Sequence, residues 1–593
     1  MVEIKINFTS RFFWFYCAIN FAIASENGSP PPIVKISDGK LSGKVLTSRS
    51  GNEYYAFLGV PFGKAKRFEV ATNPEPWVDI YNATEFGAEC MQFDLIGKTV
   101  VGDEDCLFLN VYTTHPQFEE KSSKTSETFH PVMVWLHGGG FSFGSSNIYS
   151  ANYFMDEPVV LVTLNYRLGA FGFLDTQDGV VPGNLGLRDQ RLALEWVHKN
   201  IAMFGGDSSR VTFFGSSAGA ASVALHMLTE TSALFHRGIS ESSTALSSWL
   251  IQRNPRKNAQ NLARFLNCST QPSHELVSCL KSKSGSDIVD AMSLFKLGST
   301  VSDANFLFTP SIENSPDSEQ PYLKKCPEEL IANAKFLHSI PWMVGCNKND
   351  GILNVGSILE TRSSTINEII ANWTEISPWL FVYNYDIDGG KDAMDEISFK
   401  IKGRLLSSDG QIDEDHFLTS LPILVGDRWE VSGTVKSIQK LRGKIPMFPF
   451  IFSYFGNFSY TNKFFGLKRR HGVGHLDELQ YLFDGVYGAP SYNDENKNEE
   501  TKFSQELVKL WVEFATTGRI PSTNSFRGWN HVASEPDKAM PLSFYDIADH
   551  SGIPKYIHVD ADFNERMQFW EKILPPTCKT PLWNSNSNKH LEL

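Results

Sequence analysis

The chain has 593 residues, 41% of them hydrophobic, and carries a formal net charge of −13 at pH 7. This length is ample for a large buried core, and single-domain α/β enzymes reach the same size. The negative charge is spread along the chain with no basic run to offset it, which argues against nucleic acid as a partner.

The first 24 residues have the pattern of a secretory signal peptide. Lys5 and Arg11 flank the apolar run 12–24, FFWFYCAINFAIA, whose last three residues have the small-x-small form of a cleavage site. The run is too short to span a bilayer comfortably, so an uncleaved anchor is the less favoured alternative. Since no later segment is apolar for long enough, we expect no transmembrane segment in the mature chain.

Apolar runs alternate with helix-like stretches along the rest of the chain. Runs typical of buried strands occupy 131–136, 159–168, 211–214, 340–345 and 448–455; helical patterns occupy 187–205, the residues after 217, and 500–518. Buried strands separated by helices indicate a parallel sheet covered on both faces. We predict one α/β domain over residues 25–575, with a helical insertion at about 254–336 and a polar tail at 576–593.

A Gly-Ser-Ser-Ala-Gly sequence at 215–219 lies between one such strand and a helix. This is the context in which the central serine of a G-x-S-x-G motif occupies a strained turn and acts as a nucleophile. Ser217 is that central residue, and Ser216 is its neighbour. The flanking glycines let the backbone turn tightly, and the helix N-terminus presents N–H groups to developing negative charge.

A second glycine-rich turn, His-Gly-Gly-Gly at 137–140, directly follows the run 131–136. In hydrolases with a nucleophile turn, the oxyanion is bound by the N–H of the residue after the serine, here Ala218, and by an N–H from a glycine-rich turn after an earlier strand. A plain flexible turn is the alternative, and the position of the run makes it the weaker one.

The acid and the base of a triad would follow the serine along the chain. Asp350 precedes Gly351 in a turn just after the run 340–345, and it is the candidate acid. The segment 471–483, HGVGHLDELQYLF, offers His471 and His475 as candidate bases.

Longer motifs in the same order resemble those of the type-B carboxylesterase/lipase family, the cholinesterase-like branch of the α/β-hydrolases. They are EDCLFLNVY at 104–112, HGGGF at 137–141, NYRLGAFGFL at 165–174, GNLGLRDQRLALEWV at 183–197, FGGD at 204–207, GCNKNDG at 345–351 and GHLDELQYLF at 474–483. The resemblance runs from about residue 34 to about residue 574. It implies an α/β-hydrolase fold, with a large, mostly parallel sheet, helices on both faces and helical insertions over the active site.

The resemblance also implies roles by position. Ser217 matches the nucleophile, Asp350 the acid, and His475 the base, because the family's base precedes an x-D-E-L segment. The other matched positions are Gly139, Gly140 and Ala218 in the oxyanion hole, Ser242 behind the histidine, and Trp249 near the acyl pocket. Two structural ion pairs, Arg67–Glu104 and Arg167–Asp189, are expected to be buried.

Eight cysteines are present, and removal of Cys17 with the signal peptide leaves an odd number. The resemblance implies the disulfides Cys90–Cys106 and Cys268–Cys279, which close short loops as an oxidising compartment allows. The third disulfide of cholinesterases has no clear counterpart, and the pairing of Cys326, Cys346 and Cys578 stays open.

Export would make five N-x-S/T triplets candidate glycosylation sites, at Asn27, Asn82, Asn267, Asn372 and Asn457. The last four residues, His590 to Leu593, read HLEL and resemble the tetrapeptides that retain proteins in the endoplasmic reticulum. We therefore expect a protein of the endoplasmic reticulum lumen, with secretion as the alternative.

Two departures from the family pattern bear on the substrate. Ser216 stands where the family usually has glutamate, and the loop 91–105 lacks the tryptophan that holds a quaternary ammonium in cholinesterases. The expected activity is a serine carboxylesterase that splits a small-molecule ester into acid and alcohol, without metal or cofactor. Cholinesterase or lipase-like specificity and a non-catalytic adhesion protein are the alternatives.

Overall fold

The computed structural model describes residues 31–94, 98–116, 129–293, 307–313, 321–333, 339–361, 363–383, 390–406, 410–493, 498–521, 525–526, 528–532, 542–549, 555–558, 561–574 and 578. The predicted signal peptide, the sequon at Asn27 and the HLEL tail lie outside these residues. Among the helices that the structure describes, none is both long enough and apolar enough to cross a membrane.

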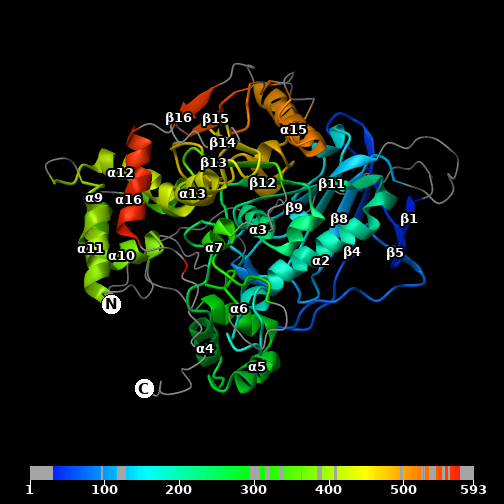
Figure 1. Ribbon diagram of the computed structural model, residues 1–593, viewed down its shortest axis with the longest axis horizontal. Coiled ribbons are helices and arrows are strands. Elements are labelled where there is room, and N and C mark those ends of the chain that lie inside the picture. The colour runs from blue at the N-terminus through cyan, green and yellow to red at the C-terminus, as the bar shows by residue number, and fades with distance from the viewer. Residues whose placement is uncertain are drawn as a thin grey trace.

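Eleven strands of the described chain form one central sheet (Figure 1). Its order is β16, β15, β14, β13, β12, β11, β9, β10, β8, β4, β3. Neighbours from β15 to β10 run parallel and both edges are antiparallel, which confirms the predicted mostly parallel sheet. The strands are β3 (Lys44–Thr47), β4 (Glu53–Pro61), β8 (Phe108–Thr113), β9 (His130–Leu136), β10 (Val160–Leu164), β11 (Gly206–Ser216), β12 (Arg237–Glu241), β13 (Trp342–Asn347), β14 (Met447–Phe452), β15 (Ser543–Ile547) and β16 (Tyr556–His558).

Two smaller sheets accompany it. One contains β1 (Ile33–Ile36), β2 (Gly39–Ser42) and β5 (Ile80–Asn82), and the other pairs β6 (Gln92–Asp94) with β7 (Thr99–Val101). The β6–β7 pair lies within the loop 91–105.

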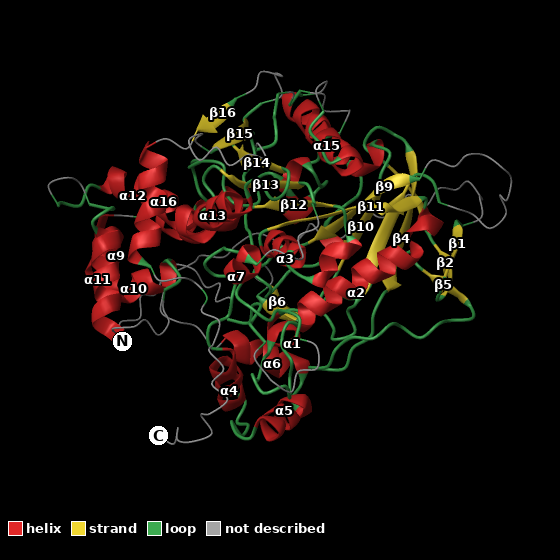
Figure 2. Cartoon of the chain, in the orientation of Figure 1, coloured by secondary structure: helices red, strands yellow, loops and turns green. Residues whose placement is uncertain are grey.

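Helices cover both faces of the central sheet (Figure 2). Along β9, Val132 and Val134 belong to one buried apolar cluster, and Met133 and Trp135 belong to another. Since successive residues of a strand point to opposite faces, a strand covered on both sides reads as one continuous apolar run. The first cluster includes apolar residues of α2 (Leu185–Asn200) and α3 (Ala218–Met227), and the second includes those of α15 (Glu499–Thr517).

The ends of these elements follow local chemistry. Asn498 Oδ1 accepts the N–H of Thr501 at 2.9 Å to start α15, and Gly518 ends it in a left-handed conformation, φ 69°. The predicted strand 159–168 is too long. Strand β10 ends at Leu164, and the side chain of the next residue, Asn165, accepts the N–H of Ser146 at 2.8 Å.

The remaining helices form two groups beside the sheet (Figure 1). The predicted insertion at 254–336 contains α4 (Pro255–Phe265), α5 (Ser273–Ser282), α6 (Gly285–Ser293) and α7 (Pro327–Ala332). The second group was not predicted as individual helices: α8 (Ile352–Val355), α9 (Ser363–Ala371), α10 (Trp373–Leu380), α11 (Gly390–Lys402), α12 (Glu414–Gly426), α13 (Ser432–Leu441) and α16 (Ala561–Ile573). Two short helices, α1 (Gly169–Phe173) and α14 (Tyr460–Phe465), follow β10 and β14.

Three disulfides join cysteines of the described chain. Cys90–Cys106 and Cys268–Cys279 form as expected, with Cα atoms 4.9 and 5.7 Å apart. The sequence left the pairing of Cys326, Cys346 and Cys578 open; in the structure Cys326 pairs with Cys578, 252 residues further along the chain, at a Cα separation of 5.8 Å. Cys346 is free and buried. The odd number of cysteines requires one that forms no disulfide within the chain, and this cysteine is Cys346.

The two expected ion pairs both form, but only one is buried. The guanidinium of Arg167 binds Asp189 through two hydrogen bonds, of 2.8 and 2.7 Å, and the Asp189 side chain is 0% exposed. Arg67 binds Glu104 in the same two-pronged way, with Nε 2.8 Å from Oε2, but the Glu104 side chain is 34% exposed. The prediction of burial is thus wrong for Glu104, whose side chain is only partly buried.

Four of the five candidate glycosylation sites lie in the described chain. Their asparagines are all exposed, at Asn82, Asn267, Asn372 and Asn457. Asn457 Nδ2 also donates to Glu500 Oε2 at 2.8 Å. Glycan attachment itself stays a prediction.

Replacing Arg167 with alanine tests the buried pair. The carboxylate of Asp189 would remain inside the protein without its cation, so the free energy of unfolding should fall by about 3–5 kcal/mol. The matched control is Arg191→Ala, because Arg191 binds Glu195 at 2.8 Å on the exposed face of α2. Its loss should cost about 0.5 kcal/mol. Urea denaturation followed by circular dichroism measures both, and equal losses would contradict the assignment.

Candidate active site

The turn between β11 and α3 places Ser217 in a strained conformation. Its φ of 58° and ψ of −122° are unusual for a residue with a side chain. The turn is tight because the glycines on either side touch the backbone of β9: a Cβ at Gly215 would lie 2.6 Å from Leu136 O, and one at Gly219 would overlap the same carbonyl. The prediction of a strand, a sharp turn and a helix here is confirmed.

The two neighbouring serines differ in accessibility. Ser216 is fully buried, and its Oγ donates to Glu478 Oε1 at 3.1 Å. Ser217 is partly exposed, and its backbone N–H donates to Glu241 O at 2.8 Å. Only Ser217 of the pair therefore has a hydroxyl that can meet an incoming molecule.

The glycine-rich turn after β9 lies against this serine. A Cβ added at Gly138 would lie 3.0 Å from Ser217 Cβ. Gly139 and Gly140 have φ values of 102° and 58°, which favour glycine. Within the described residues, neither N–H of this glycine pair donates to a carbonyl or side chain. The N–H of Ala218, at the start of α3, has no acceptor within the helix either, so three donors gather near Ser217.

His475 and Asp350 are in direct contact. His475 Nδ1 lies 2.9 Å from Asp350 Oδ1, and both side chains are buried. The other carboxylate oxygen, Oδ2, accepts the N–H of Asn347 at 2.9 Å. The hydroxyl of Ser242 donates to Asp350 Oδ1 at 3.0 Å, so Ser242 supports the aspartate. These bonds fix the carboxylate and, through it, the imidazole ring.

His471, the other candidate base, lies elsewhere. Its Nε2 is 3.8 Å from Glu360, a surface carboxylate, and burial together with Arg469 lowers its pKa. Asp350 therefore contacts His475 and not His471. The sequence alone left both histidines as candidates. The family resemblance favoured His475, which is the histidine that contacts Asp350 in the structure.

The pKa of His475 is raised to about 9. Burial alone would lower it, but the hydrogen bond and charge of Asp350 outweigh burial, and the charges of Glu430 and Glu478 add to the effect. Asp350 thus favours the protonated, positively charged ring.

Three further buried carboxyl groups lie around these residues, and the sequence analysis assigned them no role. Burial raises the pKa of Glu241, Glu430 and Glu478. Glu241 Oε1 accepts from Trp511 Nε1 at 2.8 Å, and Asn347 Nδ2 donates to Glu478. Among the described residues, no group of three His, Cys, Asp or Glu side chains is placed to hold a metal ion.

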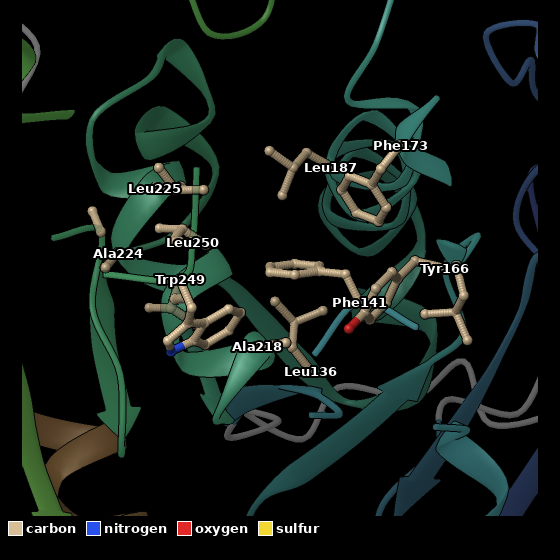
Figure 3. Packing of buried hydrophobic residues seen from close by; sticks show 14 of the residues in the cluster. Leu136, Phe141, Tyr166, Phe173, Leu187, Ala218, Ala224, Leu225, Trp249 and Leu250 are labelled. Carbon is tan, nitrogen blue, oxygen red and sulfur yellow. The ribbon is translucent and has the colours of Figure 1, made fainter. Parts of the chain in front are cut away.

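Aromatic side chains form a wall next to the glycine-rich turn (Figure 3). Phe141, which follows Gly140, lies between Trp249 and Phe173, at ring-centroid distances of 6.0 and 4.9 Å. Trp249 also stacks on Trp429 at 6.4 Å. The ring of Phe141 thus separates Trp249 from the main chain of the glycine-rich turn, and the place of Trp249 near an acyl pocket stays a prediction.

Comparison with known sequences identifies the family. The model of the carboxylesterase family matches residues 30–554. Esterase FE4 of Myzus persicae is 33% identical over 530 residues, which cover 86% of this chain and 88% of that protein. Juvenile hormone esterase of Tribolium castaneum is 31% identical over 587 residues, covering 94% and 96%.

The fold has a solved counterpart. The crystal structure of juvenile hormone esterase from Manduca sexta, with OTFP covalently attached, superposes with a TM-score of 0.74 at 24% identity, covering 92% of this chain and 99% of that chain. This likeness confirms the expected α/β-hydrolase fold. The family match and the esterase relatives show that the chain belongs to the carboxylesterase family and is a carboxylic ester hydrolase.

Proposed function

We propose that this carboxylesterase cleaves small-molecule esters through an acyl-enzyme intermediate on Ser217, with His475 as base and Asp350 as acid. The observation that carries the assignment is the 2.9 Å contact between His475 Nδ1 and Asp350. It leaves Nε2 as the ring nitrogen free for the serine. Ser216 precedes Ser217, and Glu478 lies three residues after His475, so the hydrogen bond between Ser216 and Glu478 supports the proximity of the serine and the histidine.

The mechanism uses one proton carrier. His475 takes the proton of Ser217 as its Oγ attacks the ester carbonyl, and Asp350 stabilises the imidazolium and holds the ring in the correct tautomer. The imidazolium then protonates the departing alcohol. Neutral His475 next activates a water molecule, which releases the acid and restores the serine. Because the ring must be neutral to accept a proton, activity should fall toward acid pH.

The negative oxygen of the tetrahedral intermediate needs donors already in place. The N–H groups of Gly139, Gly140 and Ala218 are proposed for this role. Their freedom from other acceptors in the described structure supports it, because fixed donors need no rearrangement when the charge develops.

Ser217→Ala tests the nucleophile. Hydrolysis of p-nitrophenyl acetate should fall by more than about a thousandfold, and labelling by a fluorophosphonate probe should be lost. The matched control is Ser216→Ala, which removes a hydroxyl one residue away. It should keep both labelling and most of the turnover. Near-normal turnover by the first variant, or a label mapped to Ser216 by mass spectrometry, would overturn the assignment.

We propose neutral esters as substrates in preference to choline esters. The loop closed by Cys90–Cys106 contains no tryptophan, so it lacks the ring that would hold a quaternary ammonium. Ser216 likewise supplies no negative charge beside the nucleophile.

Two substrates of matched acyl length test this preference. The value of kcat/KM for p-nitrophenyl butyrate should exceed that for butyrylthiocholine by at least about tenfold, the factor that corresponds to one modest cation–π contact. A preference for the choline ester would contradict the proposal.

We further propose that the protein enters the secretory pathway and stays in the endoplasmic reticulum. The three disulfides support an oxidising compartment. Deletion of 590–593 should send the protein to the medium of expressing cells, whereas the intact chain stays inside, as immunoblots of both fractions would measure. Full secretion of the intact chain would rule out retention.

A further inference from the structure

A buried hydrogen-bond network ends on the first turn of α3. Ser222 Oγ donates to Ala218 O at 2.9 Å, and Gln190 Nε2, from α2, lies 3.3 Å from the same hydroxyl. Gln190 Oε1 lies 2.8 Å from His226 Nε2, one turn further along α3. Ser222, Gln190 and His226 are all fully buried. Two helices are therefore joined at the residue whose N–H is proposed for the oxyanion hole.

The network continues into the insertion at 254–336. His226 Nδ1 contacts the hydroxyl of Tyr322, which is also 2.7 Å from Thr231 Oγ1. The backbone N–H of Tyr322 donates to Glu313 Oε2 at 2.9 Å, so the tyrosine is itself held in place. We call this series of bonds the Ser222 network; its members are Thr231, Tyr322, His226, Gln190, Ser222 and the carbonyl of Ala218.

The carbonyl at one end sets the direction of the bonds. A carbonyl can only accept, so Ser222 donates to Ala218 O and accepts from Gln190. The amide oxygen of Gln190 then faces His226, which carries its proton on Nε2 and accepts from Tyr322 at Nδ1. Burial lowers the pKa of His226 to about 3, so the ring is neutral, as this order requires. The donors all point toward α3, and hydrogen bonds aligned in this way strengthen one another.

Helix α3 depends on such support because its N-terminus has no side-chain cap. Ser217, the residue before the helix, makes no capping hydrogen bond, and the first N–H groups of a helix have no acceptor within it. In an α-helix the N–H of a residue points toward the N-terminus and its carbonyl toward the C-terminus. A hydrogen bond to the carbonyl of Ala218 therefore fixes this residue and leaves its N–H unpaired for a ligand.

We propose that the Ser222 network positions the N–H of Ala218 for the oxyanion that forms on the ester carbonyl. The inference rests on the proposed triad and oxyanion hole. Ser222, Gln190 and His226 are positioning residues, because they touch no reacting atom and act through the main chain of Ala218. A donor that is already in place when the charge develops stabilises the transition state without a rearrangement.

Ser222→Ala removes the bond to Ala218 O at the loss of one oxygen atom. The value of kcat per fluorophosphonate-labelled site should fall about tenfold, less than the factor of about a hundred or more that follows loss of a whole oxyanion donor. KM should stay within about twofold, because the oxyanion is absent from the bound ester. The acid limb of the pH profile should not move, since His226 stays neutral over the working range.

A trifluoromethyl ketone whose chain length matches the substrate probes the oxyanion directly. Ser217 Oγ adds to its carbonyl carbon, the serine proton moves to His475, and the electron pair of the carbonyl double bond goes to the oxygen, which becomes an oxyanion. Its inhibition constant should therefore rise by the same factor by which kcat/KM falls. A loss of stability alone would lower the number of labelled sites and leave this constant unchanged.

Ser398→Ala is the matched control. Ser398 is also fully buried in a helix, α11, where its Oγ donates to Met394 O, four residues earlier, at 2.9 Å and lies 2.7 Å from the hydroxyl of Tyr383. Helix α11 lies at the left edge of Figure 1, well away from α3. The control should keep the wild-type kcat per site and inhibition constant. An unmoved inhibition constant in Ser222→Ala, or an equal rise in the control, would overturn the proposal.

Tyr322→Phe breaks the network near its other end. It removes one hydroxyl and should lower kcat per site about threefold, because His226 loses its donor. Combined with Ser222→Ala it should cause little further loss, since the connection to Ala218 is already broken. Losses that multiply in the double variant would show two independent effects and contradict a connected network.

A folding failure and a wrong triad can each be distinguished from a wrong network. If Ser222→Ala does not fold, Tyr322→Phe alone decides, and an unmoved inhibition constant then counts against the network. Fluorophosphonate labelling of Ser217 in the wild-type enzyme tests the triad. A wild-type enzyme that takes no label would remove the triad itself, whereas a labelled enzyme with unmoved inhibition constants in the variants would remove only the role of the Ser222 network.

Discussion

The close approach of helix α3 to strand β9 is the constraint on which the site depends. Gly215 and Gly219 both lie against the carbonyl of Leu136, where no Cβ fits. With the helix this near, the chain between them must turn within one residue, and Ser217 takes the strained φ of 58°. Such strain costs on the order of 1–3 kcal/mol and persists only where packing enforces it. Here both sides are enforced, because β11 pairs with β9 and with β12.

The parallel strands bring the other side chains of the proposed site to the edge of the sheet at which Ser217 lies. The carboxyl ends of β11, β12 and β13 are neighbours, so Ser217, Ser242 and Asp350 lie at one edge of the sheet although they are far apart in sequence. His475 comes from a loop, and the loop is tied to this edge: Asn347 Nδ2 donates to Gly474 O at 2.7 Å. A side chain of β13 thus holds the backbone next to the histidine, which explains how a loop residue can be placed precisely enough to face Asp350.

Local patterns predicted the parts of the fold that depend on local physics. Strands were predicted from the apolar runs 131–136 and 211–214, and a turn followed by a helix was predicted from the glycines around Ser217. Burial on both faces and a tight turn each impose a residue pattern that is visible within a few positions of the sequence. The disulfide Cys326–Cys578 spans 252 residues, and nothing near either cysteine specifies its partner. The buried carboxyl group of Glu430 was missed for the same reason, because only the folded chain encloses it.

Ser216 has a physical explanation in the carboxyl groups around it. Glu241 and Glu478 are both buried; burial raises the pKa of both, and the charge of Glu478 raises the pKa of Glu241 further. A glutamate at position 216 would place another buried carboxyl against Glu478, and like charges at such range disfavour ionisation. Serine instead gives Glu478 Oε1 a neutral hydrogen-bond donor. With serine in this position there is less negative charge next to Ser217 to attract a cationic substrate, which is consistent with the proposed preference for neutral esters.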